Sequence, residues 1–317
     1  MGGKIMYFPY VRGRQYELLA LRELAEKKVL SQYVLPIIEP VKLSSTLFKT
    51  MAELIRGDKQ FGIVCNPAVG SFSNDINVAG QDDNRTNFIE LLNNPCVIKA
   101  HIMKPNSDKI VSLWEKEMGT EKKDWLVINN NRDCLNKYQD VFATDNPQYV
   151  LIPDEFRRKV RSGNKILFED RFEKCDRNSD YRNNEDEFFS EDHLFYDREG
   201  FLGFADYSIV GKAYLEAGFA PYAVAIHIIY FDKDETLRIH HFVSKSNNDI
   251  QNPAKKFYEA VAQLVDWVEE KNIPQTVGLK YFLDHYKEQT YPGLGSVKKF
   301  SLMHHLELVG DYLNKVK

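Results

Sequence analysis

The chain has 317 residues, 43% of them hydrophobic, and a formal net charge of -4 at pH 7. This length suits one barrel with additions or two domains, and the apolar content is enough for a large core. The negative charge argues against general nucleic-acid binding, which needs a clustered excess of Lys and Arg to displace counterions.

Neither the start of the chain nor its cysteines indicate a secreted or membrane protein. No apolar run approaches the roughly 20 residues needed to cross a bilayer, and residues 1–19 lack the features of a signal peptide. Cys65, Cys96, Cys134 and Cys175 are widely spaced and form no CxxC pair, so we interpret them as buried reduced thiols. We therefore expect a cytoplasmic protein without membrane association.

Short β-rich runs alternate with helical stretches over the first 210 residues. Each run is apolar almost throughout, as expected for parallel strands that helices cover on one side. Eight such runs predict closure into a (β/α)8 TIM-barrel-like core. The alternative is an open doubly wound sheet, whose usual phosphate loop has no counterpart in the sequence. The runs span residues 4–10, 33–41, 61–67, 96–103, 124–130, 148–154, 165–170 and 200–210.

Helices are expected between these runs. Apolar residues at helical spacing follow the first run, and Ser44 and Ser45 can cap the next helix. Further helices are expected to begin near Asn84, Ser107 and Arg132.

Two segments depart from the regular pattern. Residues 176–193 are rich in acidic side chains without a helical period, and we interpret them as a solvated loop. Residues 156–165 carry the basic cluster FRRKVRSGNK, which we interpret as a solvated helix face. The alternative for this second segment is a track for phosphates.

The last third of the chain predicts a hairpin followed by helices. Residues 221–231 and 236–244 alternate apolar and polar side chains around a short charged turn, which is typical of an antiparallel hairpin. A long helix is expected after Asn252 and Pro253. Two more helices are expected at 275–287 and 296–315.

We divide the chain into a barrel core over residues 1–210 and a hairpin with C-terminal helices over 211–317. No flexible linker separates the two parts. The aromatic-rich hairpin and the final helices are a candidate contact surface for a partner protein.

Polar residues that end the runs are candidates for a functional site, because active sites of such barrels lie at the carboxyl ends of the strands. Glu39, Glu169 and Asp206 are the candidate catalytic carboxylates. With Asn66 they present the oxygen ligands that Mg²⁺ prefers. Candidates for binding an anionic ligand are Arg12, Asn66, Lys104, Asn129 and Arg171.

These candidates support two hypotheses. In the first, the protein is a binding component that recognises a ligand or a partner protein. In the second, it is a metal-assisted phosphoesterase that uses Mg²⁺ to act on a phosphorylated small molecule. Both stay open, because strand ends also carry Asn, Asp and Glu as ordinary turn residues.

The histidines form a further candidate group. Neighbouring strand residues point to opposite faces, so His240 and His241 do not chelate one metal easily. On a helix, His304 and His305 diverge by about 100°. One residue from each pair could converge with His227 on a metal; the alternative is a set of half-buried, hydrogen-bonded histidines.

Several motifs distributed over the chain also form a distinctive set: MYFPYVRGRQYELLALRELAEK at 6–27, LFEDRF at 167–172, GFADYSIVG at 203–211, GFAPYAVAIHIIYF at 218–231 and YPGLGSVKKFSLMHHLEL at 291–308. Together they resemble the phage beta-protein family and, more closely, a bacterial branch of it. The resemblance implies a barrel-like fold, but no established activity and no assigned catalytic residues. It also implies a mobile two-gene cassette, in which a restriction-endonuclease-like partner protein works beside this one in phage defence.

Overall fold

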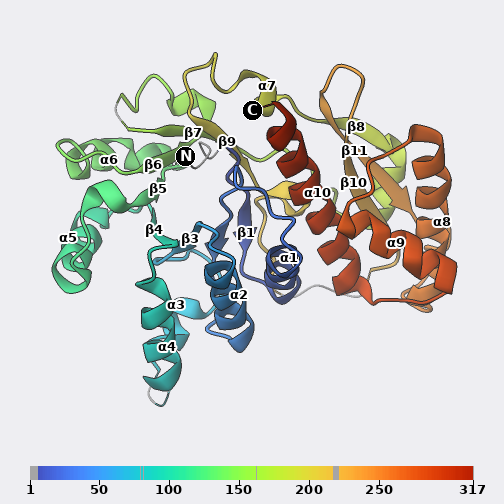
Figure 1. The fold of residues 1–317 in the computed structure, drawn as a ribbon, viewed down its shortest axis with the longest axis horizontal. Helices are drawn as coiled ribbons and strands as arrows, with labels where there is room; N and C mark the ends of the chain where they lie inside the picture. The colour runs from blue at the N-terminus through green and yellow to red at the C-terminus, as the bar shows by residue number, and fades with distance from the viewer. Residues whose placement is uncertain (1–5, 79, 81, 162, 217–220, 317) are drawn as a thin grey trace. The chain divides into compact units, whose positions relative to one another are not determined.

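The computed structural model describes residues 6–78, 80, 82–161, 163–216 and 221–316, so residues 4 and 5 of the first predicted run lie outside it. Eight strands of this part form one parallel sheet in the order β1-β2-β3-β4-β5-β6-β7-β9 (Figure 1). The strands are β1 (Tyr10–Arg12), β2 (Ile37–Glu39), β3 (Phe61–Val64), β4 (Val97–Ile102), β5 (Leu126–Ile128), β6 (Tyr149–Ile152), β7 (Lys165–Glu169) and β9 (Gly203–Asp206).

The strand order identifies the architecture. Each strand pairs with the one before it in the barrel sequence, and all of these pairs are parallel. A doubly wound sheet would reverse its strand order at a switch point. The eight strands instead form a nearly closed parallel barrel, and the predicted TIM-barrel-like fold is confirmed.

The first and last strands meet just before β1 begins. Tyr7 forms isolated parallel bridges with both Val34 and Phe204. Phe8 N donates to Phe204 O at 2.9 Å, and Phe204 N donates to Met6 O at 2.9 Å. We call these contacts of residues 6–8 with Phe204 the seam of the barrel, because they complete the ring of strands.

One cluster of buried side chains fills the inside of the barrel, and all eight strands contribute to it. Because side chains alternate along a strand, its members occupy every second position and mark the interior face. The cluster contains Phe8, Tyr10, Leu35, Ile37, Val64, Ile98, Ala100, Leu126, Ile128, Leu151, Ile166, Phe168, Ala205 and Tyr207.

Helices follow most of the barrel strands as predicted. The Ser44 side chain caps the helix after β2 by accepting a hydrogen bond from Leu47 N. The predicted helix near Arg132 begins with a 3-10 turn at Arg132–Cys134. The helices of this part are α2 (Ser45–Arg56), α3 (Phe72–Asp75), α4 (Asp82–Leu92), α5 (Ser107–Met118), α6 (Leu135–Val141) and α7 (Asp192–Phe195).

The connection from β6 to β7 has no α-helix among its described residues, which exclude Ser162. A 3-10 turn at Asp154–Phe156 is followed by a further turn and irregular chain. The helix-face interpretation of residues 156–165 is therefore wrong. The buried apolar side chains of this segment are Phe156 and Val160. Gly163 has a φ of 94°, a backbone conformation that does not occur inside a right-handed helix.

A second, three-stranded sheet is antiparallel and has the order β10-β11-β8. β10 (Ala225–Phe231) and β11 (Leu237–Val243) form the predicted hairpin, which is confirmed. β8 (Asp186–Ser190) pairs with β11 on its other side. The solvated-loop interpretation of residues 176–193 is wrong, because this segment contains strand β8, in which Phe189 is buried.

The C-terminal helices are α8 (Pro253–Lys271), α9 (Val277–Glu288) and α10 (Leu294–Val316), close to their predicted ranges. They form a core with the hairpin that includes Phe257, Leu264 and Phe282. α10 is buried throughout residues 301–310 and packs on α1 (Gln15–Glu26). In the part of the chain that is described, no helix is both long and apolar enough to span a membrane.

The chain forms two compact units, each built from three segments. The first unit contains Met1–Arg14, Gln32–Asp170 and Asp192–Tyr207, and therefore holds the barrel strands. The second contains Gln15–Ser31, Arg171–Glu191 and Ser208–Lys317. α1 and β8 thus group with the hairpin and the C-terminal helices, although both precede residue 210.

Gly203 provides a test of the seam. A Cβ atom at this position would lie 2.5 Å from Met6 O and 3.0 Å from the ring of Phe8. We expect Gly203→Ala to lower the free energy of unfolding by about 2–3 kcal/mol, because backbone and packed side chains must move. Urea denaturation followed by circular dichroism measures this loss.

The matched control is Gly62→Ala, which lies on strand β3 of the same barrel. Its Cβ would lie 3.4 Å from the nearest Ile37 atom, an ordinary contact. The control should change the free energy of unfolding by about 1 kcal/mol or less. Equal losses in the two variants would contradict a special role of the seam.

Candidate functional site

The strand alternation sorts the predicted site residues onto two faces of the barrel. Arg12 lies two positions beyond interior Tyr10, and Glu39 two beyond interior Ile37, so both belong to the interior face at the mouth. Glu169 follows interior Phe168 directly and belongs to the outer face. The same alternation puts Asp206 and Asn129 on the outer face, since Ala205, Tyr207 and Ile128 are interior. The three candidate carboxylates are therefore not brought together.

Glu39 lies at the centre of the interior group and is fully buried. Its Oε2 accepts hydrogen bonds from Tyr10 Oη at 2.7 Å and from the Arg12 guanidinium, with which it forms an ion pair. Its Oε1 accepts from Ala68 N at 2.7 Å. Both carboxylate oxygens are thus in use, as a buried charge requires.

Arg12 lies against two aromatic rings that also contact each other. Its guanidinium carbon lies 5.5 Å from the ring centres of both Tyr10 and Tyr207, within cation–π range. Tyr207 is 5% exposed, and burial raises its pKa to about 12, with Arg12 acting in the opposite direction. Its hydroxyl is therefore protonated at neutral pH. Asn130 Nδ2 donates a long hydrogen bond of 3.5 Å to the Tyr207 hydroxyl oxygen. No described residue accepts a hydrogen bond from the Tyr207 hydroxyl.

Asn66 and Lys104 continue this group around the mouth. The Asn66 amide donates to Ile102 O and accepts from Ile102 N, both at 2.8 Å, and so extends the pairing of β3 with β4. Lys104 Nζ donates to Asn66 O at 3.1 Å and to Pro67 O at 3.4 Å. Burial lowers the pKa of Lys104. Because Pro67 precedes the Ala68 that binds Glu39, one short loop connects Lys104 to the Glu39 group.

The outer-face candidates have structural contacts. Glu169 Oε1 accepts from Asp154 N at 2.9 Å and holds the turn after β6. Asp206 Oδ1 accepts from Tyr7 Oη at 2.9 Å, beside the seam. Asn129 is fully buried, and its side-chain amide has no hydrogen-bond partner in the described part of the chain. Arg171 is half-buried and belongs to the second unit.

The predicted metal site has no matching cluster. Among the described residues, no group of three or more His, Cys, Asp or Glu side chains is arranged to hold a metal ion. Glu39 already uses both oxygens within the protein, and Glu169 and Asp206 lie on the other face of the sheet. The residues present therefore do not fit Mg²⁺ in the way that the sequence predicted.

Tyr10 and Tyr207 belong to the mouth group but were not among the sequence candidates. Both tyrosines lie at interior positions of their strands, and Tyr207 directly follows the candidate Asp206. Counting every second residue along each strand selects them once the register of the barrel is known. With that register, the same count separates Glu169 and Asp206 from Glu39.

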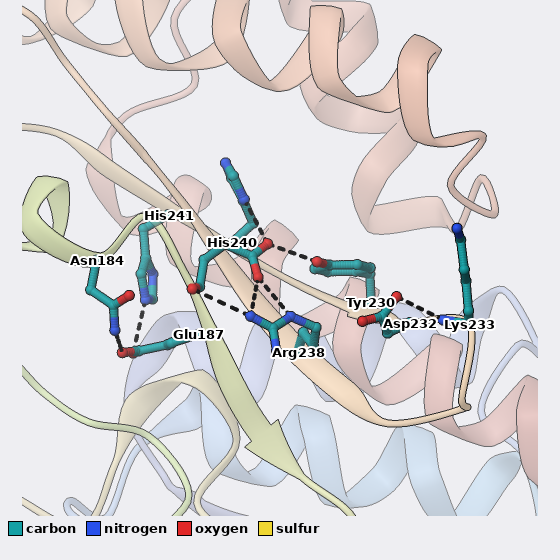
Figure 2. Close-up of polar contacts among 9 residues, drawn as sticks. Asn184, Glu187, Tyr230, Asp232, Lys233, Arg238, His240 and His241 are labelled. Atoms are coloured by element: carbon teal, nitrogen blue, oxygen red, sulfur yellow. Dashed lines mark hydrogen bonds and ion pairs between the residues drawn. The ribbon is translucent and has the colours of Figure 1, made fainter.

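The second sheet carries its own polar cluster (Figure 2). Tyr230 Oη, Arg238 Nε and His240 Nδ1 contact the carboxylate of Asp186 at 2.7, 2.7 and 3.0 Å. Burial opposes the charged form of Asp186, but the hydrogen bonds from His240, Tyr230 and Arg238 outweigh it and lower the pKa of this carboxyl. The cluster fixes β8 to the hairpin.

Half-buried His227 and buried His241 form a pair next to this cluster. Their Nδ1 atoms are 2.7 Å apart, and His241 Nε2 lies 3.1 Å from Glu187 Oε1. Burial lowers the pKa of both rings, so each is neutral at pH 7. If His241 donates from Nε2 to Glu187, its Nδ1 accepts and His227 Nδ1 donates. Glu187 in turn accepts from Asn184, as Figure 2 shows.

The two histidines of α10 are also hydrogen-bonded within the second unit. His304 contacts Thr276 Oγ1 through Nδ1 and Ile229 O through Nε2, both at 2.7 Å. Burial lowers its pKa to about 4. His305 Nδ1 lies 2.6 Å from Ser208 Oγ. These contacts support the interpretation of the histidines as hydrogen-bonded residues, although His304 and His305 are fully buried and not half-buried as expected.

The four cysteines form no disulfide. Burial raises the pKa of Cys65 to about 12 and raises that of Cys96, Cys134 and Cys175 as well. A thiol with a raised pKa is a poor nucleophile, because the thiolate is the reactive form. None of the four therefore has the environment of a catalytic cysteine.

The Glu39 pair leads to a stability prediction. Glu39→Gln keeps hydrogen-bonding atoms at this position but removes the charge opposite the buried guanidinium of Arg12. We expect a loss of about 3 kcal/mol in the free energy of unfolding, as when one partner of a buried ion pair is removed.

The matched control is Glu155→Gln, which removes the charge opposite Arg132. This pair is exposed, with 61% and 54% of the two side chains accessible, so its loss should leave urea denaturation unchanged. A Glu39→Gln variant as stable as this control would show that the buried pair is dispensable.

Glu307 leads to a prediction on pH. Burial raises the pKa of Glu307 from 4.5 to about 7, with Val277 N donating to Oε2 at 2.8 Å and opposing the shift. The folded protein then binds a proton that the unfolded chain releases, so this group destabilises the fold as pH rises from about 4.5 to 7. Glu307→Gln should therefore raise the melting temperature at pH 8 and have little effect at pH 5.

The expected gain at pH 8 is about 1 kcal/mol after allowance for solvent screening. Thermal melts of both proteins across this pH range measure it. Glu288→Gln, at an exposed position of α9, is the control and should show no such pH-dependent difference. A Glu307→Gln effect that is the same at both pH values would contradict the raised pKa.

Comparison of the chain with protein-family models, curated proteins and solved structures finds no match.

Proposed function

We propose that this barrel protein is a binding component whose ligand is a small anion held at the interior mouth of the barrel. One observation carries the proposal: the Arg12 guanidinium is fixed against the contacting rings of Tyr10 and Tyr207, and the Tyr207 hydroxyl keeps its proton without an acceptor among the described residues. A fixed guanidinium and a neutral hydroxyl are both donors for phosphate or carboxylate oxygens.

The fixed position of Arg12 favours binding. An exposed Arg side chain loses rotamer freedom when it binds a ligand, whereas Arg12 is already ordered by Glu39 and two rings. Asn130 adds amide groups on one side of Tyr207, and Lys104 adds a second cation on the same rim. The donors of the group are thus preorganised.

Metal-assisted phosphoester hydrolysis has less support from this geometry. Such a reaction needs carboxylates that are free to hold the ion, and Glu39 is saturated by Tyr10, Arg12 and Ala68. A ligand-binding role requires no further change of these contacts. We therefore place binding first and keep the phosphoesterase as the alternative outcome of a soaking experiment.

The proposal extends to the biological setting implied by the resemblance. In a two-gene phage-defence system, this protein recognises the ligand and a nuclease-like partner acts on nucleic acid. The final helix is a poor candidate for the partner surface, because α10 is buried throughout residues 301–310. The exposed aromatic side chains Phe188 and Tyr222 of the second unit are better candidates.

Binding at the mouth is tested with adenosine monophosphate as the probe. We expect it to bind the wild-type protein in calorimetric titration. Tyr207→Phe removes one hydroxyl donor to a charged group and should raise the Kd by about tenfold. The ion pair of Arg12 with Glu39 stays intact in this variant, so folding is preserved.

Tyr149→Phe is the matched control, because Tyr149 packs against the same interior cluster but precedes Val150 near the start of its strand, at the other end of the barrel. It should leave the Kd unchanged. Equal Kd values for wild type and Tyr207→Phe would reject the mouth as the binding site. Anomalous density at Glu39, Glu169 or Asp206 in a crystal soaked with Mn²⁺ would instead favour the phosphoesterase.

A further inference from the structure

The first unit contains a second hollow, separate from the interior mouth. It has a volume of about 680 Å³, which lies in the range of small-ligand sites. One wall is α6, with Arg132 just before it, and the other is the connection after β6 that carries Arg158, Lys159 and Arg161. Figure 1 labels α6, the helix that forms the first of these walls. We call this hollow the α6 cavity.

The cavity follows from the irregularity of one barrel unit. A helix normally covers the outer face after each strand of such a barrel. Here the described residues between β6 and β7 form a 3-10 turn and irregular chain in place of a helix. Gln139 Nε2 of α6 donates to Lys159 O at 2.9 Å and holds the connection beside the helix. The space of the absent helix thus becomes a hollow with fixed walls.

Four cationic side chains line this hollow. Arg132 forms an exposed ion pair with Glu155. Arg158, Lys159 and Arg161 form no ion pair with any described residue, and all three are exposed. Three like charges around one cavity repel one another and raise the local concentration of anions. This arrangement stands out in a chain whose net charge is -4.

The apolar base of the cavity includes a buried aromatic pair. The rings of Tyr138 and Phe142 lie 5.2 Å apart, and both residues line the hollow. Tyr138 is 2% exposed, and its hydroxyl has no hydrogen-bond partner within the described part of the chain. Buried hydroxyl groups normally have a partner, so this one is an unsatisfied group in a residue that lines the hollow.

We propose that the α6 cavity binds a small organic polyphosphate, with Arg158, Lys159 and Arg161 neutralising its phosphate groups and the Tyr138–Phe142 pair contacting its apolar part. Arginine forks give bidentate hydrogen bonds to phosphate oxygens, and the three unpaired cations match the charge of a di- or triphosphate. The site is independent of the anion site proposed at the interior mouth.

The observations favour a small ligand over a nucleic-acid strand. A strand needs a charged track that continues beyond one hollow, together with several stacking surfaces. Here the cations are confined to one cavity, and exposed Asp133, Asp140 and Glu155 are close in sequence to residues that line it. These carboxylates repel a longer polyanion. Binding of single-stranded DNA is therefore an outcome that would overturn the proposal.

The test uses inorganic tripolyphosphate and adenosine triphosphate as probes, titrated into the full chain by calorimetry. The double variant Arg158→Gln and Arg161→Gln removes two charge-assisted contacts and should raise the Kd for both probes by about tenfold or more. The wild-type Kd should also rise steeply with added salt. Adenosine triphosphate should bind more tightly than tripolyphosphate, because it also reaches the aromatic base.

The matched control is the double variant Lys49→Gln and Lys116→Gln, which removes the same charge from exposed positions on α2 and α5. It should bind both probes like the wild type, and thermal melts should show that all variants are folded. Tyr207→Phe should also leave the binding of tripolyphosphate unchanged, which separates this cavity from the interior mouth.

Three results would overturn the proposal. The first is an absence of binding to the wild type at low salt. The second is an equal loss of affinity in the cavity variant and in the Lys49 and Lys116 control, which would indicate a general charge effect. The third is that a 12-nucleotide single-stranded DNA binds the wild type more tightly than adenosine triphosphate does and binds the cavity variant more weakly. This result would make the hollow a nucleic-acid contact.

Discussion

The closure of the barrel at the seam is the constraint on which the rest of the first unit depends. Met6 and Phe8 each share a hydrogen bond with Phe204, and this pairing brings the first and last strands together into a nearly closed ring. A closed ring has a fixed inside, so the alternation of side chains decides which residues can meet. Gly203 permits the approach because it has no Cβ. Tyr7 and Asp206 reinforce it from the outer face.

The buried ion pair at the mouth follows from that fixed inside. A charge in a barrel interior is costly unless its partners are in place. Glu39 forms an ion pair with Arg12, and Tyr10 and Ala68 donate two further hydrogen bonds to the Glu39 carboxylate. Arg12 therefore loses little freedom when an anion arrives. The cations of the α6 cavity differ from Arg12 because they are exposed. Among them, only Arg132 forms an ion pair with an acidic side chain of the described residues, that of Glu155.

The fold could be predicted largely from the sequence, since apolar runs and their spacing reflect the packing of strands under helices. The cap at Ser44 and the hairpin of β10 and β11 were predictable for the same local reason. β8 was missed because its charged residues, such as Asp186, find partners on distant strands. The segment after β6 was misjudged because basic residues suit a helix surface and a cavity wall equally.

The candidate site was only partly predictable. Sequence position identified Arg12, Glu39, Asn66 and Lys104 as strand-end residues, and these do share contacts around the mouth. It could not assign Glu169 and Asp206 to a face without the register of the barrel. A shift of one residue changes the face, and run boundaries carry larger errors than that.

The interleaving of the two units has a consequence for biosynthesis. α1 leaves the ribosome early, but α10, on which it packs, follows some 270 residues later, a delay on the order of ten seconds or more at usual elongation rates. During that time α10 cannot cover the apolar face of α1, whose Leu18, Leu21 and Leu24 are all buried in the finished protein. The barrel likewise waits for Phe204 before it can close. The nascent chain thus presents an amphipathic helix to chaperones while it is made, and no single cut releases a complete unit.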